Sequence, residues 1–196
     1  MSCDESTPCC PEMQTLPPGA MIPSCCQVGL TELAKRASAA MLRGGIYHWL
    51  DWGSLLGVIR SGSLIPWDRD VDFGVWSDQL KALSMVNWGR LRYVESGGPD
   101  YSGKGLAPFP RIYLSETNGL YADVYVWDRD GHEAVMRWED HEFRCPAAHY
   151  DIHIVGRLGG TKLPVPSLTE AYLKLRYGAD WRTPDPLFYQ RGRRAR

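Results

Sequence analysis

The sequence has no apolar run of about 18 residues, the length that a membrane-spanning helix requires. Its N-terminus also lacks the basic segment followed by an apolar stretch that marks a secretory signal peptide. The 22 lysines and arginines nearly balance the 23 aspartates and glutamates, so the net charge is −1. A near-neutral chain has no strong field for nucleic acid. We therefore expect a soluble chain, cytoplasmic by default, with no membrane span and no nucleic-acid partner.

Regular secondary structure is not expected at the start of the chain, because prolines recur throughout residues 1–26. The same segment holds five of the six cysteines, which are Cys3, Cys9, Cys10, Cys25 and Cys26. Four thiolates around Zn²⁺ would supply the folding energy that such a loop-rich segment lacks. Their spacing differs from that of a Cys-x-x-Cys zinc ribbon, so disulfides and metal-free thiols remain alternatives.

Two aspartates alternate with apolar residues in the run Asp70-Val71-Asp72-Phe73. Successive side chains of a strand point to opposite faces, so the two carboxylates project the same way. At a separation of roughly 7 Å they repel each other unless a cation lies between them. Oxygen ligands of this kind suit Mg²⁺ or Mn²⁺. The pair therefore predicts a divalent-metal site.

A Gly53-Ser54 turn precedes these acids in the chain. Gly53 allows the backbone to approach a ligand closely. A short helix beginning near Leu55 would present its amide groups and the positive end of its dipole to a phosphate. A phosphate beside a carboxylate-held metal is the arrangement of a phosphoryl-transfer site.

The order of Gly53-Ser54 and Asp70-Val71-Asp72 resembles the signature of the nucleotidyltransferase superfamily typified by DNA polymerase β. The longer string 47–75, with Gly-Ser-Leu-Leu-Gly, Arg60 and Ile-Pro-Trp-Asp-Arg-Asp-Val-Asp, is similar to the LicD and fukutin family and most of all to its fukutin-related members. The similarity extends over about residues 25–186. It implies an α+β nucleotidyltransferase fold, with a mixed central sheet flanked by helices.

We expect three segments on this basis. They are a cysteine-rich, zinc-binding loop over residues 1–28, a LicD-like catalytic domain over 29–190 and a basic tail over 191–196. Apolar periodicity and capping residues predict helices over 31–42, 77–88 and 167–178, with Met85 inward and with Ser77 and Ser167 as caps. Strands are predicted over 46–52, 111–114 and 120–127.

The resemblance also implies which cysteines bind zinc. The family has a zinc-binding loop before its catalytic motif, and that loop ends in an adjacent pair like Cys25-Cys26. Transferring the pattern gives Cys3, Cys10, Cys25 and Cys26 as ligands, with Cys9 as the alternative to Cys10.

A third acid, Asp123, lies among apolar and aromatic residues in the predicted strand 120–127, where a carboxylate is costly unless it is paired or metal-bound. The superfamily places its third carboxylate on such a neighbouring strand, so the resemblance implies Asp123 for this role. Asp68 is a fourth acid on the same face as the first pair. Arg60 and Arg111 are predicted to neutralise phosphate charge.

The resemblance implies a transferase that moves ribitol 5-phosphate from CDP-ribitol to a sugar hydroxyl of a glycan or glycoprotein. Asp70 and Asp72 would hold Mg²⁺ or Mn²⁺ against the donor diphosphate, and Asp123 would complete the metal site as its third carboxylate and accept the proton of the attacking hydroxyl. Gly53 and Ser54 would bind phosphate. Fukutin-like enzymes work in the Golgi lumen behind a membrane anchor, so a fragment of such a protein would belong there.

Three other functions remain open from the sequence. Phosphocholine transfer from CDP-choline is typical of the LicD relatives and would use the same acids. A non-catalytic glycan- or nucleotide-binding relative has no reason to keep several costly carboxylates. A nucleotidyltransferase acting on nucleic acid is disfavoured by the near-neutral charge.

Overall fold

The computed structural model of the chain describes residues 4–8, 10, 12–95, 99–100, 105–106, 109–138, 141–151 and 153–188. The predicted basic tail, 191–196, lies outside these residues. Their helices are α1 (Glu12–Thr15), α2 (Ser24–Arg43), α3 (Trp52–Ser61), α4 (Leu80–Ser84) and α5 (Thr169–Tyr177), with the 3-10 helices η1 (Ser77–Gln79) and η2 (Ala147–Tyr150). Their strands are β1 (His48–Leu50), β2 (Val71–Trp76), β3 (Arg92–Val94), β4 (Pro99–Asp100), β5 (Gly105–Leu106), β6 (Arg111–Tyr113), β7 (Tyr121–Asp130), β8 (Glu133–Trp138), β9 (His141–Pro146), β10 (His153–Leu158) and β11 (Thr161–Pro166).

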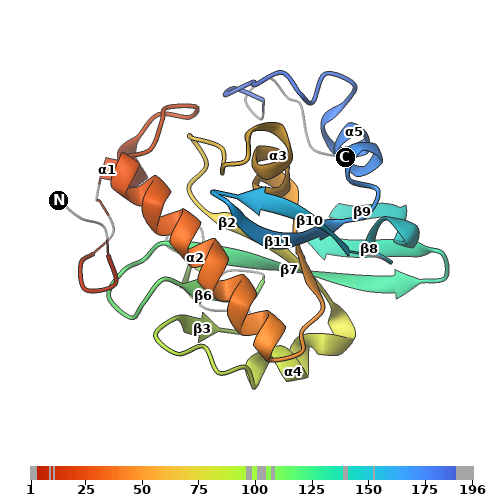
Figure 1. The fold of residues 1–196 in the computed structure, drawn as a ribbon, viewed down its shortest axis with the longest axis horizontal. Helices are drawn as coiled ribbons and strands as arrows, with labels where there is room; N and C mark the ends of the chain where they lie inside the picture. The colour runs from red at the N-terminus through yellow and green to blue at the C-terminus, as the bar shows by residue number, and fades with distance from the viewer. Residues whose placement is uncertain are drawn as a thin grey trace.

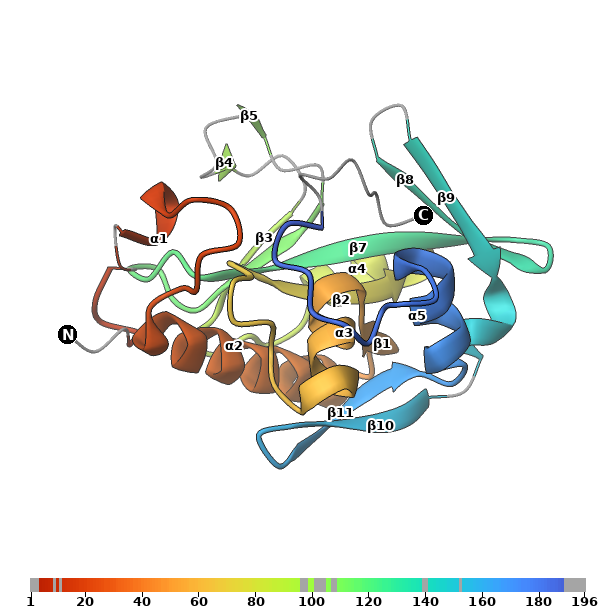
Figure 2. The same cartoon turned by 90° about the horizontal axis from the view of Figure 1, so that it is seen from above.

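One central sheet runs in the order β1-β2-β7-β6-β3, and β8 and β9 extend it from β7. β2 pairs in parallel with β7 but antiparallel with β1, so the sheet is mixed. Figures 1 and 2 show α2 along one side of this sheet and the β8–β9 hairpin beyond the end of β7. The expected α+β fold with a mixed central sheet flanked by helices is therefore confirmed. No helix among the described residues is long and apolar enough to span a membrane.

The alternation of side chains along β2 separates the core from the site. Val71, Phe73 and Val75 are fully buried on one face. α2 covers this face, since the Ser38 hydroxyl lies 2.8 Å from Nε2 of His48, whose ring packs against Phe73. Asp72, Gly74 and Trp76 project from the opposite face. Asp72, the acid of β2, therefore points away from α2.

The structure begins α2 earlier than the prediction of 31–42. The helix starts at Ser24, directly after the last proline of the N-terminal segment, Pro23. The buried stripe of α2 already begins at Cys26 and continues through Leu30 and Leu33. Cys25 and Cys26, which lie in the segment expected to be irregular because of its prolines, are thus part of the first turn of α2, and the short helix α1 lies in the same segment.

The strand predicted over 46–52 is shorter, and the helix predicted near Leu55 begins at Trp52. Asp51 ends the strand by capping α3, because its carboxylate accepts the Trp52 N–H at 2.9 Å. Trp52 has a positive φ of 39°, a conformation that few residues other than glycine adopt. The chain therefore turns sharply just before Gly53.

Two other helix predictions were wrong in part. The stretch 77–88 forms only η1 and α4, because Val86 and Asn87 are weak helix formers, and Met85 is 80% exposed. Ser77 is not the cap there, because it is the first residue of η1 and Trp76 occupies the N-cap position. α5 ends at Gly178 as predicted, but Ser167 does not cap it, since the Ser167 hydroxyl donates to the carbonyl of His149.

Candidate active site

Two aspartates lie side by side on the parallel strands at the centre of the sheet. Asp72 on β2 is in register with Asp123 on β7, and both are less than a tenth exposed. Asp70 and Asp68 lie on the segment that leads into β2 and are partly exposed. The structure thus places the four predicted acids in one region of the sheet.

These carboxylates repel one another. Burial, followed by the charges of Asp123 and Asp68, raises the pKa of Asp70 to about 8. Burial raises the pKa of Asp68 to about 7, although the positive charge of Arg60 opposes the rise. Burial and the charges of Asp70 and Asp68 also hold the pKa of Asp72 well above its usual range. Such a concentration of negative charge would be stabilised by a bound cation.

Ser54, in the first turn of α3, forms two hydrogen bonds with Asp72, one as donor and one as acceptor. The Ser54 N–H donates to Oδ2 of Asp72 at 3.0 Å, and the Asp72 N–H donates to the Ser54 hydroxyl at 2.8 Å. The backbone of Gly53 also lies close to two carboxylates, because a Cβ added there would lie 2.5 Å from Oδ2 of Asp68 and 3.3 Å from Oδ2 of Asp72. A larger residue at position 53 would therefore have to displace the Asp68 carboxylate.

We predict that Gly53→Ala lowers turnover about 100-fold, because the added methyl group displaces the Asp68 carboxylate. The helix should remain, since alanine is a better helix former than glycine. Gly119→Ala is the matched control, because a Cβ at that position meets nothing within 4 Å. Steady-state kinetics together with circular dichroism would test this. Equal activity of the two variants would show that Asp68 does not need its place against Gly53.

The two predicted phosphate-binding arginines lie in different surroundings. Arg60 on α3 is half-buried, and its pKa is lowered by burial against the opposing charge of Asp68. Arg111 begins β6, and its Nε donates to Oδ1 of Asp123 at 2.6 Å. Arg111 therefore holds the carboxylate of Asp123, and its predicted contact with phosphate stays a prediction.

A divalent cation suits these donors, but the acids do not form a closed cage. Among the described residues, no three carboxylates bring oxygens within 4.8 Å of one another. Mg²⁺ in phosphoryl-transfer sites is commonly held by one or two carboxylates and by substrate phosphates. The raised pKa of Asp70 and of Asp72 shows that burial and the neighbouring carboxylates outweigh the favourable interactions, which for Asp70 include the positive charge of Arg111. Asp70 and Asp72 are thus suited to an ion whose remaining ligands come from substrate or water.

Three predicted zinc ligands meet at the start of α2. The Sγ atoms of Cys10, Cys25 and Cys26 lie within 4.8 Å of one another. Sγ of Cys10 is 3.2 Å from Sγ of Cys25, well beyond the ~2.05 Å of a disulfide bond. This contact lowers the pKa of Cys25 and so favours the thiolate that a metal binds. The fourth predicted ligand, Cys3, and the alternative to Cys10, Cys9, lie outside the described residues.

Sequence reasoning missed a buried charged group next to the site. The carboxylate of Asp51 is fully buried at the start of α3 and accepts hydrogen bonds from the backbone of Trp52, from the Tyr172 hydroxyl and from two indoles. Burial raises the pKa of Asp51, and the Tyr172 hydrogen bond and the positive charge of Arg176 oppose this rise. Arg176 is itself only 1% exposed. An aspartate directly before a helix is a common N-cap, and this pattern could have identified Asp51 from the sequence.

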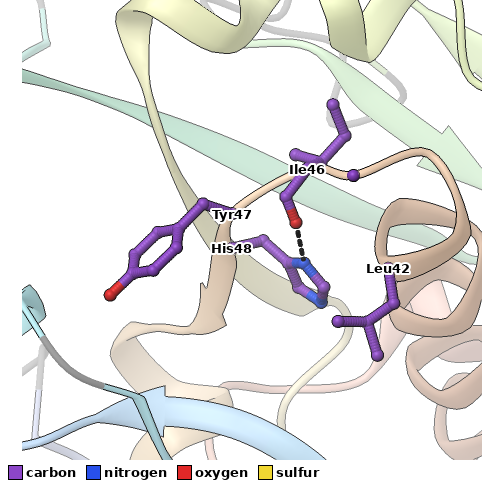
Figure 3. Close-up of a pocket in the computed structure, with 5 residues that line it drawn as sticks. Leu42, Ile46, Tyr47 and His48 are labelled. Atoms are coloured by element: carbon purple, nitrogen blue, oxygen red, sulfur yellow. Dashed lines mark hydrogen bonds between the residues drawn. The ribbon is translucent and has the colours of Figure 1, made fainter.

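The hollow drawn in Figure 3 lies away from the acids. It is lined by Leu42, Gly45, Ile46, Tyr47 and His48, at the end of α2 and the start of β1. Nδ1 of His48 is 3.0 Å from the Ile46 carbonyl, so its ring is held toward the chain rather than presented to a ligand. The site is therefore defined by the acids and the Gly53-Ser54 turn, and not by this hollow.

The chain is similar to proteins of known description. It is 29% identical to "Ribitol 5-phosphate transferase FKRP" of Mus musculus over 82% of this chain and 33% of the relative. The Homo sapiens protein of the same name is 29% identical over 80% of this chain and 32% of its own length. The chain thus spans about a third of the length of these relatives.

A solved structure of ANT(2")-Ia in complex with adenylyl-2"-tobramycin overlaps 76% of this chain and 76% of its own, with a TM-score of 0.45 and 16% identity. At this level of similarity we infer nothing about the active site from that structure. A family model described as "LicD/FKTN/FKRP, nucleotidyltransferase domain" matches residues 45–167, a range that contains all four acids and the Gly53-Ser54 turn. The chain belongs to the LicD/FKTN/FKRP family, and its matched region is the nucleotidyltransferase domain of that family.

Proposed function

We propose that this protein is a metal-dependent transferase that moves ribitol 5-phosphate from CDP-ribitol to a sugar hydroxyl of a glycan or glycoprotein. The observation that carries the proposal is the grouping of Asp72 and Asp123 on paired strands, with Asp70 and Asp68 beside them, against a glycine-led helix terminus. The curated relatives named as ribitol 5-phosphate transferases support the choice of the transferred group.

The N-terminal turn of α3 is the element that would bind the donor diphosphate. Gly53 has no side chain, so the backbone of the turn lies close to the Asp68 and Asp72 carboxylates, and the amides at a helix start favour negative charge. Ser54 is fixed by its two bonds with Asp72, which hold the turn beside the acids. Arg60, on the same helix, lies within electrostatic reach of Asp68 and adds positive charge on this side.

Asp70 and Asp72 would hold the divalent ion. When bound, Mg²⁺ or Mn²⁺ would supply Lewis-acid stabilisation of charge that builds up on the phosphate oxygens. Asp123, oriented by Arg111, would accept the proton of the acceptor hydroxyl. The hydroxyl oxygen then bonds to the phosphorus of ribitol phosphate, and the bond to CMP breaks, so the products are a phosphodiester and CMP.

The aromatic residues near the site favour ribitol over choline. A choline group is usually held by aromatic faces. Trp49 and Trp127 are fully buried and donate their indole N–H groups to Asp51. The ring of Tyr121 is already covered by the guanidinium of Arg111, 4.2 Å from its centroid. These three rings are therefore engaged within the fold, which supports a polyol with hydrogen-bonding hydroxyls as the transferred group.

We predict CMP release and labelling of a glycan acceptor from CDP-ribitol in Mg²⁺, with little product from CDP-choline. Titration calorimetry with CDP-ribitol, CDP-choline and ATP would compare binding directly, and EDTA would serve as the metal-free control. Product from CDP-choline alone would replace the donor while keeping the mechanism. Binding of none of the three would reject the catalytic proposal.

We also propose that Cys10, Cys25 and Cys26 bind a structural Zn²⁺, with Cys3 as the fourth ligand. Their clustered Sγ atoms support this. We predict about one zinc per chain in metal analysis. Strong chelation should first loosen the segment before α2, measured by limited proteolysis, while the near-ultraviolet signal of the core tryptophans persists. Zinc-free protein with paired disulfides would contradict this prediction.

A further inference from the structure

The helix α5 reaches the proposed phosphate-binding turn through Asp51. This carboxylate receives hydrogen bonds from several elements at once. Its Oδ1 accepts the Trp52 N–H at 2.9 Å and the hydroxyl of Tyr172 on α5. Its Oδ2 accepts the indole N–H of Trp127 on β7 at 2.9 Å and that of Trp49 on β1 at 3.3 Å. The residue before α3 is thus tied to two strands and to α5.

A second residue of α5 holds the side chain of Trp52. The guanidinium carbon of Arg176 lies 4.5 Å from the centroid of the Trp52 ring and 5.1 Å from that of Trp127. Arg176 is almost fully buried, and its positive charge faces the negative charge of Asp51. Tyr172 and Arg176 are four residues apart on one helix, so they share a face. One face of α5 therefore contacts both Asp51, which accepts the backbone N–H of Trp52, and the ring of Trp52.

Trp52 is the residue that needs this support. Its φ of 39° is unfavourable for an L-residue, and such a conformation persists only where the surrounding contacts determine it. It sets the direction of the chain into Gly53 and Ser54. The Ser54 N–H then reaches Asp72 at 3.0 Å. A relaxed Trp52 would move that amide away from the carboxylate.

We propose that Tyr172 and Arg176 are positioning residues for the active site, which act through Asp51 and Trp52 to hold the Gly53-Ser54 turn against Asp72. The inference rests on the proposed function for its catalytic meaning. Its physical content, the restraint of the turn by α5, is measurable without any substrate.

The test is amide hydrogen exchange on Tyr172→Phe, which removes one hydroxyl and keeps the ring. We expect exchange at the Trp52 and Ser54 amides to accelerate about tenfold or more, as follows from losing a hydrogen bond to a charged group. The amide of Leu33, in the buried middle of α2, should exchange at its original rate. Tyr93→Phe, a tyrosine of β3 stacked on Trp88, is the matched control and should leave all three amides unchanged.

A second variant tests the restraint of the turn without changing the Tyr172 hydroxyl. Arg176→Lys retains a positive charge opposite Asp51 but loses the flat guanidinium against Trp52. It should show the same selective acceleration at Ser54. Equal acceleration at Leu33, or no acceleration at Ser54 in either variant, would overturn the proposal, since a helix that only stabilises the fold protects all core amides alike.

Binding of CDP in Mg²⁺ supplies the functional readout. In Tyr172→Phe the dissociation constant of CDP should rise about tenfold, whereas in Tyr93→Phe it should not change. If the wild-type protein binds no CDP, the proposed function fails, and the exchange measurement alone still decides whether α5 restrains the turn. Selective exchange with unaltered CDP binding would overturn the positioning role.

Discussion

Asp70→Asn is expected to lower turnover on CDP-ribitol on the order of 10³-fold while the fold remains intact. The neutral amide keeps the shape of the side chain but removes the charge that would attract the metal ion. The same charge is unfavourable in the metal-free protein, because burial and the charges of Asp123 and Asp68 oppose its ionisation. Thermal stability without metal should therefore stay equal or rise as activity falls.

Asp78→Asn is the control for this experiment, since Asp78 is an exposed acid on η1 and lies after β2. Its activity and melting temperature should match those of the wild type. The measurements are steady-state CMP release and thermal unfolding in EDTA. Wild-type activity in Asp70→Asn would remove Asp70 from the proposed site.

Asp51→Ala is expected to lower the free energy of unfolding by about 3–5 kcal/mol. The substitution leaves the Trp49 and Trp127 indole N–H groups without their acceptor in a fully buried position. It also leaves Arg176 buried without the opposing carboxylate. Because a domain of ordinary stability has about 5–15 kcal/mol in total, a large part of the margin would be lost.

Urea denaturation followed by tryptophan fluorescence measures this change. Glu32→Ala, an exposed acid on α2, is the control and should alter stability by no more than about 0.5 kcal/mol. A loss of less than about 1 kcal/mol in Asp51→Ala would mean that water replaces the missing carboxylate, contrary to the burial of this position.

The central strands and their acids were predictable because local alternation determines them. Val71 and Phe73 are buried on one face of β2, whereas Asp72 projects from the other, as the period of two requires. The pairing of Asp72 with Asp123 was less accessible to sequence reasoning, because register between distant strands depends on tertiary packing. The family resemblance supplied that partner.

The network around Asp51 could not be predicted for a different reason. Its donors come from β1, β7 and α5, and no local pattern relates those segments. The early start of α2 was not predicted, because the buried apolar stripe of this helix begins at Cys26, close to prolines that disfavour a helix. The stretch 77–88 does not form one continuous helix, because the weak helix propensity of Val86 and Asn87 outweighs its apolar spacing.

The bond between Tyr172 and Asp51 joins residues that are 121 positions apart. A ribosome delivers Asp51 long before α5 exists, so a nascent chain carries the Gly53-Ser54 turn without its restraint for most of its synthesis. Contacts of this sequence separation also slow folding, since a long loop must close before they form. If α5 restrains the turn as proposed, the turn reaches its final geometry only after nearly the whole domain has been made, and a chain released before α5 would retain every acid of the site without the contact that holds the turn against Asp72.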